Sequence, residues 1–271
     1  MKRSEQGPLP LLVFICGLGA AAIFWWNLSR PVPIPAQQMA SEPLALATPP
    51  SAPSEHPSME LQLTAQPLAA SQISAALIDF LGRKAVQQFV QLDDFPRRFV
   101  ATVDNLGRSY APSMTWPIKP TVGRFKVAQR GEGAAISDLN SLRYTPLVAL
   151  AEQIDIAQTV ELYVRMYPLL QKSYEELGYP NRKFNDRVLE VIDQLLQTPA
   201  GGQILNVQLV EVKGSVPSLR PWVRFEFVDP ALEALSAGQK IMLRIGPDNQ
   251  SRLKAWLFAI RMEILRHAQA Q

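Results

Sequence analysis

Three tyrosines and one asparagine have the spacing needed to build a polar site in this chain. Tyr163, Tyr167 and Tyr174 fall on the apolar arc of one predicted helix, and Asn185 falls on that of the next, at about 100° per residue. A buried hydroxyl or amide without a partner costs on the order of 1–3 kcal/mol. The pattern therefore predicts a buried, hydrogen-bonded Asn185. It either clamps the helices in register or lines a small tyrosine-rich binding pocket.

Arg97 and Asp104 are a second candidate pair, because they lie two turns apart at the border of one apolar helix face. Salt bridges to other elements are their expected role, and ligand binding is the alternative. Asp186, Glu190 and Asp193 lie opposite the apolar arc of their own helix. This placement is typical of a solvated face, which is a commoner explanation than general acid–base catalysis.

Cysteine and histidine are almost absent from the body of the chain. Cys16 lies in an apolar N-terminal run, and the two histidines are His56 and His267. Zinc sites, thiol nucleophiles and Ser-His-Asp catalysis are therefore disfavoured, and we predict no metal site, no cofactor and no catalytic residue. The net charge is +3 and no clustered basic stripe is apparent, which argues against nucleic acid as a partner.

The N-terminal residues have the features of a membrane anchor. Residues 8–29 carry no charge and are long enough to cross a lipid bilayer as a helix. Lys2 and Arg3 precede this run, and two tryptophans near its end suit the membrane interface. We predict a cytoplasmic segment 1–7, a single-pass anchor in a bacterial inner membrane, and a periplasmic remainder. A cleaved signal peptide is the alternative, but no good small-x-small site follows the apolar run.

The remaining chain divides into a spacer and one domain. Residues 30–71 are rich in proline, alanine and serine, which predicts a disordered linker. Residues 72–267 predict a mostly helical globular domain with a small β-hairpin, an α+β fold, and 268–271 form a short tail. The hairpin is expected from residues 204–213 and 221–228, where apolar and polar residues partly alternate.

Several local signals set the expected boundaries within the domain. Asp155 is expected to be the N-cap of the helix that carries the three tyrosines. Asn181 is expected to be the N-cap of the helix that carries Asn185. Pro168 lies inside the first of them and is expected to kink it. A short strand is expected around 123–128, and Gly107 should follow the end of a helix.

Three long blocks of the domain resemble a known family. They are "RRFVATVDNL", "YPLLQKSYEELGYPNRKFNDRVLEVIDQLL" and "LEALSAGQKIMLRIGPDNQSRLKAWL". In this order they resemble a bacterial family of domains of unknown function, numbered 3014, over most of residues 72–267. The resemblance implies a single-span protein with a variable linker and a helical domain. It implies no activity, so no catalytic residue is carried over.

Two functions are consistent with these observations. The first is a non-enzymatic binding or scaffold module of the cell envelope, attached to the bilayer through residues 8–29, with a protein or a glycan as partner. The second is an envelope glycan hydrolase or transferase, with Asp104, Asp186, Glu190 or Asp193 as its acids. A cleft with two carboxyl groups about 5–9.5 Å apart would favour the enzyme. The lack of a recognisable catalytic set favours the binding module.

Overall fold

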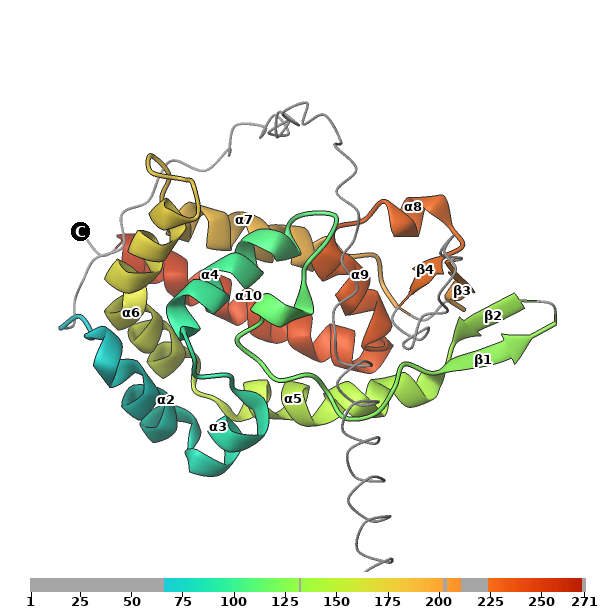
Figure 1. The fold of residues 1–271 in the computed structure, drawn as a ribbon, viewed down its shortest axis with the longest axis horizontal. Coiled ribbons are helices and arrows are strands. Elements are labelled where there is room, and N and C mark those ends of the chain that lie inside the picture. Colours follow the sequence, from blue (N-terminus) through green and yellow to red (C-terminus); the bar gives the residue numbers. More distant parts are fainter. Residues whose placement is uncertain (1–65, 132, 202–203, 211–223, 270–271) are drawn as a thin grey trace, which may run out of the picture. The chain divides into compact units, whose positions relative to one another are not determined.

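The computed structural model describes residues 66–131, 133–201, 204–210 and 224–269 (Figure 1). The predicted anchor and most of the predicted linker lie outside these ranges. In the part of the chain that is described, no helix is both long enough and apolar enough to cross a membrane.

The described domain is mostly helical, as the sequence predicts. Its longer helices are α2 (Ile73–Leu81), α4 (Phe95–Leu106), α5 (Ser141–Gln153), α6 (Ile156–Glu176), α7 (Phe184–Leu196), α9 (Ala237–Arg244) and α10 (Pro247–Gln269). Shorter pieces are η1 (Ala70–Gln72), α3 (Arg83–Phe89), η2 (Ser113–Thr115), η3 (Asp138–Asn140) and α8 (Pro230–Glu233). Helix α4 packs on α6 and α7, and α10 packs on α5, α6 and α7.

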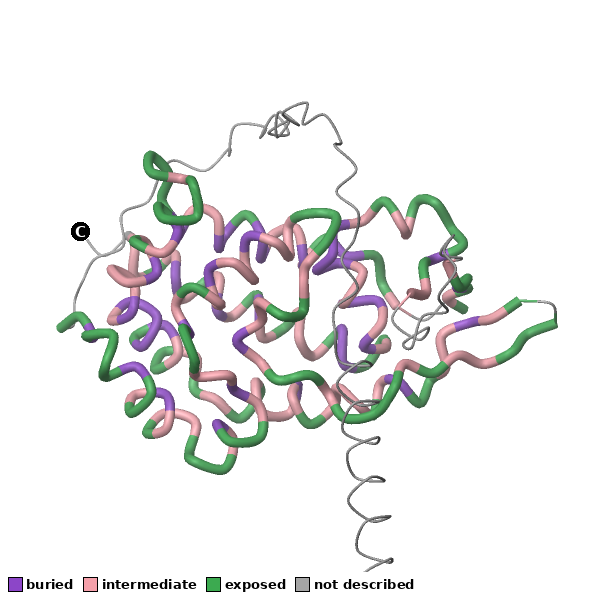
Figure 2. Tube along the Cα trace, viewed as in Figure 1, coloured by how far each residue is buried: buried purple, intermediate pink, exposed green. Residues whose placement is uncertain are grey.

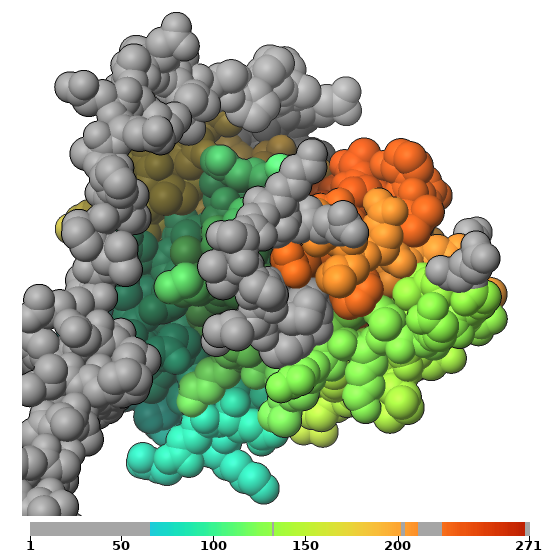
Figure 3. Space-filling view, turned by 45° about the vertical axis from the view of Figure 1, so that its right-hand side comes forward, coloured from blue at the N-terminus to red at the C-terminus, as the bar shows by residue number. Residues whose placement is uncertain are grey.

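A small antiparallel sheet accompanies the helices. Its strands β1 (Val127–Arg130), β2 (Gly133–Ile136), β3 (Asn206–Leu209) and β4 (Phe225–Phe227) lie in that order. The predicted hairpin is confirmed as β3 and β4, where Val207 faces Phe227. The predicted strand near 123–128 begins later, at Val127, and forms a second hairpin with β2. In Figure 3, this light-green hairpin lies against the orange residues of the other two strands.

The core has a large and a small part. The large cluster lies where α6 and α7 pack on α4 and α10, and Val164, Leu170 and Phe184 are fully buried in it. The small cluster lies under the sheet and is formed by Val207, Phe227 and Leu243. Figure 2 shows that buried positions gather on the helices, whereas the segment between α4 and β1 is mostly exposed or half-buried.

The two predicted helix caps have different outcomes. The Asp155 carboxylate accepts a hydrogen bond from the Gln158 amide at 2.8 Å, so this N-cap of α6 is confirmed. The prediction for Asn181 is wrong, because α7 begins at Phe184 and Lys183 occupies the N-cap position without a side-chain cap.

Two glycines allow close approaches that a side chain would block. A Cβ atom on Gly238 would lie 2.5 Å from a methyl carbon of Leu195 and 3.0 Å from the Leu106 carbonyl oxygen, which allows α9 to pack closely against both α4 and α7. Gly107 ends α4 with an ordinary φ of −76°. Its Cβ would lie 2.6 Å from the Arg187 guanidinium, so the requirement for glycine here is space rather than a left-handed turn.

Candidate functional site

Asn185 lies between α6 and α7 with no exposed surface. The Tyr163 hydroxyl donates a hydrogen bond to its Oδ1 at 3.2 Å, so the predicted burial and hydrogen bond are confirmed. Burial raises the pKa of Tyr163 well above its usual value. The Asn185 Nδ2 has no partner in the described part of the chain. This pair joins the two helices through one buried polar contact, and neither residue lines a cavity described below.

Gln171 caps the helix that Asn181 was expected to cap. Its Oε1 accepts hydrogen bonds from the Phe184 amide at 2.8 Å and from the Tyr167 hydroxyl at 3.1 Å. Its Nε2 donates to the Arg182 carbonyl at 2.9 Å. Thus Tyr167 acts through Gln171 on the start of α7, and one glutamine on α6 satisfies backbone groups of the turn that follows it.

Tyr174 is buried beneath the turn between the same two helices. Its ring stacks on Tyr179 with 4.5 Å between the centroids, and the Phe184 ring lies 5.4 Å away. Burial raises the pKa of Tyr174 to about 12, and the negative charge of Asp104 adds to this rise. The three predicted tyrosines therefore contribute to the packing and polar contacts of one helical hairpin.

Asp104 is the centre of an ion cluster that links α4 to α7. Only 4% of this residue is exposed. Its carboxylate lies 3.1 Å from Arg187 Nε and 2.7 Å from Arg108 Nη2, and it accepts a hydrogen bond from the Tyr179 hydroxyl at 3.3 Å. Arg187 Nη2 also donates to the Asp104 carbonyl at 2.7 Å. The expected salt bridge to another element is confirmed for Asp104, whereas Arg97 is exposed and lies outside the cluster.

The predicted acidic face of α7 is only partly solvated. Glu190 is exposed and lies 2.9 Å from Arg187. Asp193 is half-buried, and its carboxylate lies 2.5 Å from Arg261 Nε on α10, so it connects two helices. Asp186 is half-buried as well. The expectation of a solvated face is therefore wrong for Asp193, because α10 packs on this side of α7 through Arg261.

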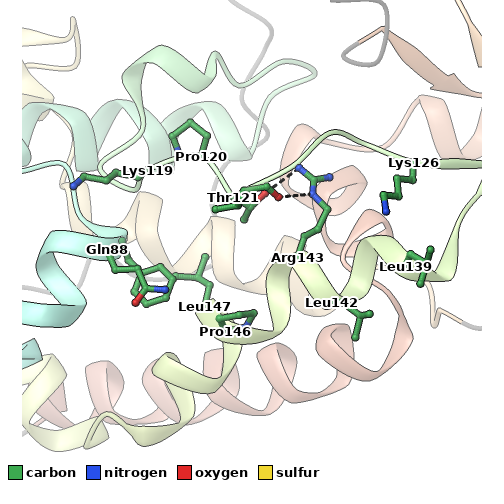
Figure 4. A pocket seen from close by; sticks show the side chains of 12 residues that line it. Gln88, Lys119, Pro120, Thr121, Lys126, Leu139, Leu142, Arg143, Pro146 and Leu147 are labelled. Atoms are coloured by element: carbon green, nitrogen blue, oxygen red, sulfur yellow. Dashed lines mark hydrogen bonds between the residues drawn. The ribbon is translucent and has the colours of Figure 1, made fainter.

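A cavity of about 420 Å³ opens at a different place, between α3 and the start of α5 (Figure 4). Residues 119–126 form its third wall. Phe89, Leu142 and Leu147 supply apolar surface. The basic residues of the wall are Lys119, Lys126 and Arg143, and no carboxylate lines the cavity among the residues that the structure describes.

Arg143 and Asn140 hold the wall 119–126 in place. Arg143 Nε donates to the Val122 carbonyl at 3.1 Å, and its Nη2 donates at 3.1 Å to both Thr121 Oγ1 and the Gly123 carbonyl, as Figure 4 shows for Thr121. Asn140 is buried, and its Oδ1 accepts from the Lys126 amide at 2.9 Å. The wall is thus fixed to η3 and α5 by neutral groups, and Arg143 forms no ion pair with a carboxylate in the described part of the chain.

A second cavity of about 330 Å³ adjoins the first, because Lys119 lines both. It is bounded by Ile78, Val86 and Leu92 and carries one further cation, Arg83. No acidic residue of the described chain lines it. Together the two cavities offer apolar hollows beside positive charge, which suits a ligand that combines anionic and apolar groups.

Sequence reasoning missed this basic face. The cations are spaced too widely in sequence to form a visible run, so no basic stripe is apparent. A signal that could have found it is the lack of acidic residues. Residues 105–131, which include Lys119 and Lys126, contain five basic residues and no carboxylate. Among the described residues, no group of three or more His, Cys, Asp and Glu side chains could hold a metal ion.

Tyr174 predicts an alkaline loss of stability. An exposed tyrosine in the unfolded chain ionises near pH 10, whereas the folded pKa is about 12. The stabilisation is complete below pH 10 and is lost as the pH rises toward 12, because the unfolded chain gives up its proton first. Urea unfolding should show a decrease of about 2 kcal/mol over this interval. The Tyr174→Phe variant should show a smaller decrease, and equal decreases in both proteins would contradict this origin.

Comparison with known proteins gives one match. The family model described as "Protein of unknown function (DUF3014)" matches residues 95–261. No curated protein and no solved structure matches the chain.

Proposed function

Because the chain belongs to the DUF3014 family of proteins of unknown function, we propose a function from its own residues: it is a non-enzymatic binding module held at the inner membrane of a bacterial envelope. Residues 8–29 are the anchor, residues 30–71 are the spacer, and the helical domain lies on the periplasmic side. The binding surface is the pair of cavities that share Lys119.

The observation that supports this proposal is that one set of polar residues is engaged inside the fold, whereas another set faces outward at the cavities. The tyrosines, Asn185 and Asp104 are engaged with one another or with neighbouring helices. The cavity beside α3 and α5 instead presents apolar surface and cations to the outside. A surface that is concave, apolar and of one charge sign is suited to holding a partner by complementarity.

Three of the four carboxylates considered for glycan hydrolysis are bound to arginines. Asp104 is shared by Arg108 and Arg187, and Asp193 is bound by Arg261 through two hydrogen bonds of 2.5 and 3.2 Å. Glu190 also lies against Arg187. These contacts occupy the oxygen atoms that a general acid would have to offer to a sugar. The binding module is therefore the function we favour.

Hydrogen exchange tests the proposed binding surface. The full chain is compared in native membranes and after purification in detergent. Peptides that cover residues 119–126 and 139–147 should exchange about tenfold more slowly in native membranes, which corresponds to a partner at about ten times its Kd. Peptides that cover residues 172–183, which are mostly exposed and line neither cavity, serve as the control and should be unchanged. Equal exchange of the cavity peptides in both preparations would contradict the proposal.

The topology is tested separately with a C-terminal tag. External protease should remove the tag from spheroplasts without breaking the inner membrane. A tag that is protected until the cells are lysed would contradict the periplasmic placement, whatever the cavity binds.

A further inference from the structure

The face around the larger cavity has an unbalanced charge. Three cations, Lys119, Lys126 and Arg143, line the cavity, and no described carboxylate lines it. Lys119 Nζ donates to the Gln87 carbonyl, and Arg143 donates only to neutral oxygens of neighbouring groups. Lys126 is exposed and forms no ion pair with a described carboxylate. The positive charge of these three residues is therefore available to a partner. Asp138 is exposed nearby in sequence, but it lines neither cavity.

Apolar side chains project from the same face. Val122 is 91% exposed and Leu142 is 65% exposed, and Leu139 is exposed beside them. All three line the cavity that Lys119, Lys126 and Arg143 also line. Figure 4 labels the two leucines and the three cations. Large apolar side chains gathered at an open surface usually mark a place of contact. Here they alternate with cations, which is the composition of a surface that lies on a charged interface.

We infer that this face docks on an anionic phospholipid bilayer, with Val122, Leu139 and Leu142 entering the headgroup region. Lys119, Lys126 and Arg143 then lie near the lipid phosphates. Three hydrogen bonds from Arg143 to residues 121–123 position Val122 before contact, so little ordering is required on docking. The inference rests on the proposed function, since it names the partner of the same surface.

A lipid surface fits these observations better than an acidic protein. Val122, Leu139 and Leu142 line the cavity and are also exposed to the outside, where a fluid interface can surround them. The cations are spread around the opening, as suits a layer of many mobile phosphates more than one fixed carboxylate. The predicted anchor and spacer would also keep the local lipid concentration high, so a weak contact is sufficient.

The test uses the full chain with Cys16→Ser and Val122→Cys, labelled with the polarity-sensitive dye NBD at position 122. The protein is placed in nanodiscs of phosphatidylcholine alone or of phosphatidylcholine mixed with phosphatidylglycerol. NBD emission should be at least about twofold higher in the anionic discs. The difference should disappear when salt is raised from about 0.1 M to about 1 M, which shortens the Debye length from about 10 Å to about 3 Å.

Matched variants locate the effect. Lys126→Glu should abolish the rise in emission, because its side chain makes no described ion pair and the hydrogen bonds to Asn140 use only its backbone. Lys172→Glu makes the same charge change on the exposed side of α6 and should leave the rise intact. A label at Phe258→Cys, a position 56% exposed on α10, should not respond to anionic lipid. Melting temperatures confirm that each variant is folded.

Three outcomes would overturn the inference. The first is equal emission in both kinds of disc, and the second is an equal rise at positions 122 and 258. The third is a rise caused by added polyglutamate in neutral discs but not by anionic lipid, which would assign the surface to an acidic polypeptide. If the chain instead fails to enter discs and stays dissolved without detergent, the proposed anchor fails. Co-sedimentation of the labelled chain with the same lipids as vesicles then decides the docking on its own.

Discussion

Replacing Asp104 by alanine is expected to lower the free energy of unfolding by about 3 kcal/mol, because Arg187 loses its buried partner and keeps only the exposed Glu190. Arg187 is largely buried and lies 3.1 Å from the Asp104 carboxylate. Tyr179 would lose a hydrogen-bond acceptor at the same time. Urea denaturation followed by circular dichroism measures the change, and the slope of the transition should stay the same if the folded state is preserved.

Two controls separate the ion cluster from a general effect on α4. Arg97→Ala alters an exposed residue on the same helix and should change stability by less than about 0.5 kcal/mol. The double variant Asp104→Leu, Arg187→Met removes both charges and should recover part of the loss. A loss below about 1 kcal/mol for Asp104→Ala would show that the cluster does not hold α4 on α7.

Phe184→Ala is the second large effect, with an expected loss of about 3–5 kcal/mol. The side chain has no exposed surface and is the first residue of α7. Its ring contacts Tyr174 at 5.4 Å and Phe99 at 6.2 Å between centroids, so its removal leaves a cavity where α4, α6 and α7 meet. Thermal and urea unfolding of the same variant should both report the loss.

The matched control for this change is Phe258→Ala. Phe258 is also aromatic and helical, but more than half of its surface is exposed. Its truncation should cost less than about 1 kcal/mol. Similar losses at the two positions would contradict the assignment of the main core to the region where α4, α6 and α7 meet.

Much of the helical fold could be predicted from the period of apolar residues. The arcs on α6 and α7 are nearly continuous, so the helices and their buried faces follow from sequence. Strand β2 was not predicted, because Gly-Ala-Ala-Ile has little β-propensity and is ordered by its neighbours on both sides. The prediction of an N-cap at Asn181 was wrong for a similar reason. The amide at the start of α7 is bound by Gln171 of α6, and this contact between two helices is not visible in the local sequence.

The candidate site was predictable only in part. Asn185 stood out because one amide lay within an apolar arc, and that reasoning needs only the helix period. Arg187 and Tyr179 could not be assigned to Asp104 in this way, because they lie far away in sequence and meet it only after α4 packs on α7. The exposure of Val122 depends on the hydrogen bonds that Arg143 donates to the Val122 and Gly123 carbonyls. No local sequence pattern predicts these contacts, because Arg143 lies about 20 residues further along the chain.

On the proposed function, the residues that hold the fold differ from those that bind the partner. One hydrogen-exchange measurement in native membranes tests this distinction most directly. Lys126→Glu should keep the melting temperature and remove the slow exchange of residues 119–126. Asn185→Ala should lower the melting temperature and, at a temperature where it is folded, retain that slow exchange. If Asn185→Ala removed the protection while Lys126→Glu kept it, the binding surface would have to be sought at the α6–α7 hairpin.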